Sequence, residues 1–276
     1  MIIKMTFLFI ASSIIFINAL ADASNFGIGV HSGYGVLKYE EQTSALGTDR
    51  KSKASMNTVL LGASGEYSFS KLDKLYAGVT TDFAFGTDDR ETWKDNGVKI
   101  QTNDIRIFGQ FYDFRLGYKN SIDYFYYRLY ISAGWDGIRF TRNDFQERGI
   151  VIHGETTEDF SLWRTGAGMG LGYKFNKWAL DGRAAYSYYP EGKVRNSSYE
   201  RITFDTNGTC LDLGIGIGRA ITNNIGFYMG GFYTLIMLDE SEVKRAVSKT
   251  GTITSVVFPD SRTELMGGVV NLTYAF

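Results

Sequence analysis

The chain contains very little proline, cysteine or histidine, and each shortage narrows what the protein can be. Its 276 residues include 2 Pro, 1 Cys and 2 His. The single cysteine, Cys210, excludes an internal disulfide, and no spacing of residues matches a zinc or calcium site. A formal net charge of −1 gives no electrostatic reason to expect a nucleic-acid partner. We therefore predict no cofactor, no metal and no nucleic-acid binding.

Long apolar runs are also lacking, apart from one at the N-terminus. Lys4 precedes an apolar stretch over 5–17, and Ala19, Ala21 and Ala23 follow it. This pattern is typical of a secretory signal peptide with a cleavage site after Ala21 or Ala23. A membrane anchor is the alternative, although about 13 apolar residues are too few to span a bilayer comfortably. We predict a signal peptide at 1–23 and one domain over 24–276.

The remaining sequence is rich in glycine and aromatic residues and alternates with a period of two. The chain has 32 Gly, and aromatic residues make up 15% of it. Alternation of this kind indicates β-strands. We predict ten of them, at roughly 26–40, 56–69, 74–86, 102–118, 123–141, 158–174, 177–190, 206–220, 223–239 and 262–276.

The connections between these strands alternate between short and long. The predicted short ones are 70–73, 119–122, 175–176 and 221–222, and the long ones are 41–55, 87–101, 142–157, 191–205 and 240–261. This regularity favours an all-β fold, a single transmembrane antiparallel up-and-down barrel with tight periplasmic turns and long extracellular loops. Both termini would then be periplasmic.

The two faces of the predicted strands differ in polarity. Leu129 and Ile131 share one face of the fifth strand, while Arg128 and Asp136 share the other. Apolar outside and polar inside is the arrangement of a barrel in lipid. The predicted lumen collects acidic and basic side chains in near balance: Glu66, Asp82, Asp113, Asp136, Asp181 and Asp212 against Arg115, Arg128, Arg164, Lys174 and Arg183. We expect these charges to pair into a plug, with a charged pore as the alternative.

The end of the sequence places Leu272, Tyr274 and Phe276 on one face of a strand. It resembles the C-terminal signature of Gram-negative outer-membrane β-barrels, in which the terminal Phe serves as the assembly signal. The resemblance implies a location in the cell outer membrane. It also implies the barrel-assembly machinery and outer-membrane lipid as partners, with lipopolysaccharide as a candidate lipid.

Several short strings resemble the omptin family of outer-membrane endoproteases. They are the glycine-rich run 165–175 with 178–182, the pair Tyr186 and Ser187 with 201–204, and 133–135 with 139–141. The resemblance implies a ten-stranded barrel with five large outer loops. It also implies a proteolytic site, in which an Asp-His pair and two aspartates activate a water molecule.

The residues needed for that chemistry are not at the matching positions. The segment 191–200 contains no histidine, and the matched aspartate positions of the second outer loop hold Arg90 and Thr92. A rearranged site would have to use His153 in the third outer loop with nearby carboxylates: Asp88, Asp89, Glu91 and Asp95. The other histidine, His31, is predicted to face the lumen as part of its polar network.

These observations lead to one preferred function and two alternatives. The preferred one is a surface-exposed barrel whose outer loops bind an extracellular ligand, without proteolysis. The first alternative is an omptin-type endoprotease with rearranged catalytic residues. The second is a narrow channel, which requires a continuous wet path between the lumen charges.

Overall fold

The computed structural model describes residues 26–45, 47–69, 72, 74–147, 149–199, 202–248 and 251–276. The predicted signal peptide at 1–23 lies outside these residues, as does most of the predicted short turn at 70–73. No helix among the described residues is long and apolar enough to cross a membrane. The strands are β1 (Phe26–Thr43), β2 (Arg50–Ser68), β3 (Leu75–Gly86), β4 (Asp89–Asp95), β5 (Val98–Ile122), β6 (Phe125–Glu147), β7 (Ile150–Phe175), β8 (Trp178–Asn196), β9 (Phe204–Ala220), β10 (Ile225–Leu238), β11 (Lys244–Val247), β12 (Ile253–Val256) and β13 (Asp260–Ala275).

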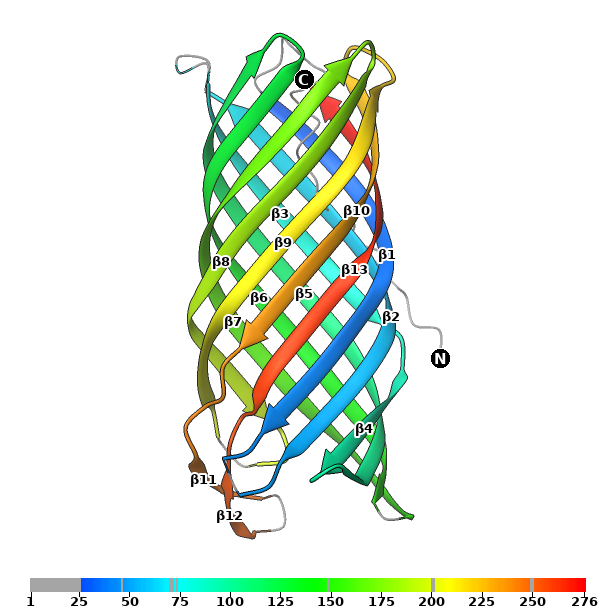
Figure 1. The fold of residues 1–276 in the computed structure, drawn as a ribbon, viewed down its shortest axis with the longest axis vertical. Coiled ribbons are helices and arrows are strands. Elements are labelled where there is room, and N and C mark those ends of the chain that lie inside the picture. The colour runs from blue at the N-terminus through cyan, green and yellow to red at the C-terminus, as the bar shows by residue number, and fades with distance from the viewer. Residues whose placement is uncertain are drawn as a thin grey trace, which may run out of the picture.

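The sheet closes on itself as an antiparallel barrel (Figure 1). Each strand pairs with its neighbours in the order β1-β13-β10-β9-β8-β7-β6-β5-β3-β2, and β1 pairs with β2 to complete the ring. β4 continues β3 in the same direction, since both pair with β2 and β5. The wall therefore has ten positions, as the sequence predicts, and every strand in it has a neighbour on both sides.

The predicted long loops are wrong in extent, because strands occupy most of them. β2 begins at Arg50, inside the predicted loop 41–55, and β4 lies wholly within 87–101. β6 and β7 extend to Glu147 and from Ile150 through the predicted loop 142–157. β8 continues to Asn196 and β9 starts at Phe204, while β11 and β12 form a hairpin inside 240–261. These segments are polar because one of their faces meets water, which the composition alone does not separate from a loop.

Two of the predicted short turns are displaced by one or more residues. β5 runs to Ile122, so 119–122 is strand and the turn lies at Asp123 and Tyr124. The turn after β7 lies at Asn176 and Lys177, one residue beyond the predicted 175–176. Asp123 and Asn176 both adopt positive φ, which these short polar side chains tolerate better than most others.

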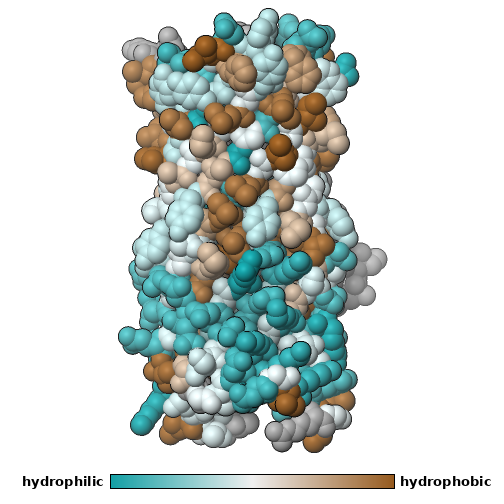
Figure 2. All heavy atoms as spheres, in the orientation of Figure 1, coloured by the Kyte–Doolittle hydropathy of each residue, from teal (hydrophilic) through white to brown (hydrophobic). Residues whose placement is uncertain are grey.

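The barrel has two zones along its axis (Figure 2). The zone nearest the short turns, which we call the belt, exposes apolar and aromatic side chains. The zone towards the other end, which we call the collar, exposes charges that pair across neighbouring strands, such as Lys53 with Glu40 and Arg139 with Asp159. Outward residues of the belt include Ile28, Val30, Tyr34, Leu129, Ile131, Ile215, Met229, Val270 and Leu272.

The interior follows the reverse pattern, so the prediction of a polar inside is correct for the belt and wrong for the collar. The collar encloses an apolar cluster that includes Leu37, Ile138, Leu162, Val194 and Leu238. A wall in water gains free energy by turning its apolar face inward, as a soluble barrel does. The inversion of the alternation therefore marks where the lipid-facing surface ends.

Four aromatic rings from separate segments pack against one another across the collar interior. The Tyr39 and Phe140 ring centroids are 4.1 Å apart, and Phe160 meets both Phe140 and Phe258 at 5.6 Å. β1 and β6 are not neighbours in the wall, so Tyr39 and Phe140 meet across the lumen. Ala246 of β11 and Val256 of β12 belong to the same buried cluster. The last connection therefore packs against the core at this end of the barrel.

Phe160→Ala should destabilise the barrel strongly, because it removes the ring that joins two others in the packed interior. We expect the free energy of unfolding to fall by about 3–5 kcal/mol, measured by urea unfolding of the refolded protein in detergent. The control is Val98→Ala at a strand tip, where the side chain is 68% exposed. Equal effects from the two substitutions would show that the collar interior is not packed in solution.

Candidate functional site

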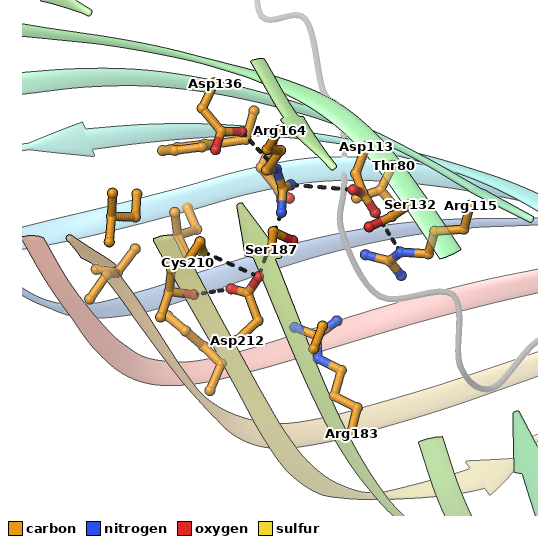
Figure 3. A pocket seen from close by; sticks show the side chains of 18 of the residues that line it. Thr80, Asp113, Arg115, Ser132, Asp136, Arg164, Arg183, Ser187, Cys210 and Asp212 are labelled. Atoms are coloured by element: carbon orange, nitrogen blue, oxygen red, sulfur yellow. Dashed lines mark hydrogen bonds and ion pairs between the residues drawn. The ribbon is translucent and has the colours of Figure 1, made fainter. Parts of the chain in front are cut away.

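The belt interior is organised around the Arg164 guanidinium (Figure 3). Arg164 on β7 reaches Asp136 on β6 at 3.3 Å, Asp113 on β5 at 3.4 Å and Asp212 on β9 at 3.6 Å. Arg115 makes a second contact to Asp113 at 2.5 Å. A buried carboxylate is costly unless paired, so this arrangement stabilises three aspartates with two arginines.

A second group of charges lies nearer the short turns. Glu66 accepts from Arg128 at 2.8 Å and from Lys119 at 3.0 Å. The Tyr126 hydroxyl donates to Asp181 at 2.7 Å. The Lys174 ammonium lies over the Tyr126 ring, 5.9 Å from its centroid.

All eleven charged residues predicted for the lumen line the belt interior. Ten of them take part in the contacts described here or in the pair between Asp82 and His31, which are 3.0 Å apart. The eleventh, Arg183, lines the cavity described next. Lys119 was missed, because its position was assigned to a turn.

A cavity of about 120 Å³ lies between these charges, large enough for several water molecules. Arg115, Arg164 and Arg183 line it together with Asp82, Asp113 and Asp212. Asp212 also accepts from the Thr234 hydroxyl at 2.6 Å and contacts the Cys210 thiol at 3.6 Å. Phe111 and Phe232 pack against the apolar cluster of the collar and line this cavity as well. The cavity therefore ends at the collar core.

A cluster of three glutamates around one arginine lies within the collar. Arg142 on β6 contacts Glu91 at 2.8 Å, Glu158 at 2.9 Å and Glu41 at 3.4 Å. All four side chains are buried. The Arg142 guanidinium also lies over the Trp93 ring at 5.8 Å. We call this group the Arg142 cluster.

The carboxylates of the Arg142 cluster accept different sets of hydrogen bonds from neighbouring polar side chains. Glu91 accepts from the Ser52 hydroxyl at 2.9 Å and from the Asn103 amide at 2.8 Å. Glu41 accepts from the Tyr39 hydroxyl. One guanidinium cannot neutralise three carboxylates, so at least one of them is expected to hold a proton.

The pKa values of the cluster identify Glu41 as that group. Burial raises the pKa of Glu41 to about 8, since the attraction of Arg142 is opposed by the nearby Glu158 and Glu91 carboxylates. Burial also acts to raise the pKa of Glu91, but Arg142 and the hydrogen bonds from Asn103 and Ser52 hold it below its ordinary value. The proton therefore resides on Glu41 near neutral pH.

Sequence reasoning found only Glu91 of this cluster, and for a different role. Glu41 and Arg142 fall in segments that were predicted to be loops, and Glu158 lies at a predicted strand boundary. Their shared feature is the two-residue period, which continues from Tyr39 to Glu41 and from Phe140 to Arg142 on the buried face. Extending the two-residue alternation through the polar segments would have predicted that Glu41 and Arg142 are buried.

The structure does not bring the protease candidates together. Glu91 is fully buried and bound to Arg142, while His153 lies exposed on β7. β5 and β6 separate β4 from β7 in the wall, which corresponds to about 14 Å at the usual strand spacing. Asp95 contacts Arg50 at 3.8 Å, Asp89 accepts from the Arg90 backbone N–H at 2.7 Å, and Asp88 lies exposed between β3 and β4.

Among the described residues, no group of His, Cys, Asp and Glu side chains is arranged to hold a metal ion. The acidic side chains of the belt and collar instead bind arginines, lysines and hydroxyl groups.

The closed sheet, the apolar belt and the charged interior define a transmembrane β-barrel. The family described as the outer membrane protein beta-barrel domain matches residues 7–200. The chain belongs to this family of outer-membrane proteins.

A solved structure shows a similar fold at low sequence identity. The outer membrane protease OmpT from Escherichia coli has a TM-score of 0.66 and 12% identity, over 91% of this chain and 97% of that one. The transport unit of the autotransporter AIDA-I from Escherichia coli has a TM-score of 0.42 and 10% identity, over 92% and 91%. The OmpT structure supports an omptin-like barrel shape. No curated protein matches the chain.

The stability of the barrel should depend on pH through Glu41. Because the folded state raises the pKa of this carboxyl from 4.5 to about 8, it binds the proton more tightly than the unfolded state. The free energy of unfolding should therefore fall as pH rises from about 4.5 to about 8. Glu41→Gln should remove this fall. The measurement is urea unfolding at about pH 5, 6.5 and 8, which covers the range between the ordinary and the shifted pKa of Glu41. Glu40→Gln, on the outer surface of the same strand, is the control. An unchanged pH profile in Glu41→Gln would place the proton elsewhere.

Proposed function

We propose that this protein is a closed outer-membrane barrel that presents its collar at the cell surface for binding, without proteolysis and without forming an open channel. The observation that carries the proposal is the packed collar core, which closes the lumen above the belt cavity. Ion pairs surround that cavity, and the aromatic core with the Arg142 cluster fills the collar. What remains accessible for function is the outer surface of the collar.

The orientation is part of this proposal. Barrels of the bacterial outer membrane have short turns on the periplasmic side and their longer connections outside the cell. We therefore place the short turns and both termini in the periplasm, with a signal peptide at 1–23 directing export. The collar then projects from the membrane into the medium.

The proposed lipid and assembly partners concern the belt surface. Leu272, Tyr274 and Phe276 are exposed on the outer face of the last strand, and Phe276 stacks on Phe26 of β1 with centroids 5.4 Å apart. This position is accessible to the barrel-assembly machinery while the ring is still open. Outer-membrane lipid, with lipopolysaccharide as a candidate, would cover the belt.

The protease alternative requires a water molecule held between a base and an orienting carboxylate. The separation of His153 from β4 and the burial of Glu91 do not supply that geometry. We therefore expect no cleavage of a dibasic reporter peptide by the refolded barrel in lipopolysaccharide-containing detergent.

The cleavage experiment includes a His153→Ala variant as its control. Cleavage by the wild type that disappears in His153→Ala would overturn the non-proteolytic proposal and establish a site at the third outer connection. Equal cleavage by both proteins that persists after repeat purification would also overturn the proposal, with a site that does not use His153, whereas cleavage lost on purification would come from a contaminating protease.

The channel alternative requires a continuous wet path. In planar bilayers, we expect no stepwise conductance from the wild type, because the collar core closes the path above the cavity. Replacing 244–258 with a short Gly-Ser linker removes Ala246, Val256 and Phe258 from that core. This variant should conduct more often than the wild type. Regular conductance steps from the wild type would support the channel instead.

A further inference from the structure

The projecting end of β7 is an open sheet edge on an otherwise closed wall. β7 pairs with β6 out to Ile150, opposite Glu147. Its pairing with β8 ends at Glu158, opposite Asn196. Residues 150–156 therefore have a neighbouring strand on one side only, among the parts of the chain that the structure describes.

The projecting end of the wall consists of β4, β5, β6 and β7, and its β4 side, unlike its β7 side, is paired. β4 pairs with β2 through Arg50 to Lys53, opposite Asp95 to Thr92. The segments β4, β5, β6 and the outer part of β7 thus form a sheet that continues the wall and ends at β7 (Figure 1). Such an edge presents a row of backbone N–H and C=O groups that can pair with another strand.

The point where the pairing stops shows which backbone groups face the open side. The Ser197 N–H donates to the Thr157 carbonyl at 2.8 Å, and the Thr157 N–H donates to the Ser197 hydroxyl at 2.7 Å. Thr157 therefore directs both of its backbone groups away from β6. Because these directions alternate along a strand, Glu155 directs its N–H and C=O to the same open side.

The side chains along this edge are also accessible. Every residue over 150–155 is exposed. The exposed fractions are 68% for Ile150, 52% for Val151 and 43% for Ile152. Three successive apolar residues place apolar groups on both faces of the strand, which is unusual for a surface in water.

We infer that this edge binds an extended peptide segment of another protein by strand addition. Backbone hydrogen bonds to β7 would supply the main attraction, and alternate β-branched or apolar side chains of the peptide would pack on Ile150, Val151 and Ile152. This names the class of partner for the surface binding proposed above and rests on that proposal.

Two other occupants fit the edge less well. Barrel strands tilt by about 35–45° from the membrane normal, so two copies related by rotation about the normal would bring their β7 edges together at about 70–90°. Strands at that angle cannot pair over several residues. A lipid bilayer would cover the apolar side chains but leave the edge N–H and C=O groups without partners, which hydrocarbon does not tolerate.

A β-bulge divides the edge into two short stretches. His153 and Gly154 lie opposite Asp144 alone, and Asp144 adopts a positive φ of 50°. A Cβ built on Gly154 would meet nothing within 4 Å, so a peptide can approach the backbone closely there. The bulge bends the strand and would restrict binding to peptides that follow the bend.

The test uses the refolded full chain and a fluorescent octapeptide of alternating Thr and Val as the probe, with binding followed by anisotropy. Glu155→Pro removes the N–H at the open edge, and proline is tolerated at such positions. Glu155→Ala removes the same side chain and keeps the N–H. We expect Glu155→Pro to weaken binding about tenfold or more relative to Glu155→Ala, since a strand hydrogen bond is lost and its neighbours are blocked.

Three outcomes would overturn the inference. These are no binding by the wild type, equal binding by the two Glu155 variants, and equal binding of an octapeptide whose alternate amides are N-methylated. Binding of the collar to phosphatidylcholine vesicles that is lost in Ile150→Ser would instead assign the tip to a membrane surface. Cleavage and conductance measured on the same samples separate a failure of this edge from a failure of the proposed function.

Discussion

Complete pairing of the backbone is the constraint on which the rest of this molecule depends. Within hydrocarbon, no water can satisfy a free N–H or C=O group, so a sheet must close on itself. The pairing of β1 with both β2 and β13 achieves this closure. Once the ring is closed, each side chain has only two directions available, towards the surroundings or towards the lumen. The distribution of polar and apolar residues along every strand follows from that choice.

The change of surroundings along the axis explains the two zones. In the belt the surroundings are apolar, so charges turn inward and must neutralise one another, as Arg164 does for three aspartates. In the collar the surroundings are water, so charges turn outward and aromatic rings fill the interior. The Arg142 cluster is an exception within the collar, because it keeps three carboxylates and one guanidinium away from water. Protonation of Glu41 lowers the cost of that arrangement.

The closed lumen bears directly on function. An omptin-like shape does not by itself imply proteolysis, because activity depends on the site rather than on the fold. Here Glu91, one of the candidate catalytic carboxylates, is bound to Arg142, and the lumen ends in packed rings. Among the residues that the structure describes, the end of β7 has a backbone edge without a partner strand, and this edge lies outside the belt. In water, such an edge is permitted, and it is also the place where another chain can add.

Sequence alone determined the barrel, its ten positions and the inward direction of the belt charges, because a two-residue period is a local property that each strand carries by itself. Arg128 and Asp136 could be placed inside the barrel from the residues beside them in β6. Tertiary structure decided which charges meet, since Arg164 and its three aspartates come from four strands. It also decided where strands begin and end. Polar residues such as Lys51 and Lys53 look like loop in composition, and only the water outside the collar shows them to be the outer face of β2. The sequence did not reveal the Arg142 cluster, because its members lie far apart in the chain and meet only when the ring closes.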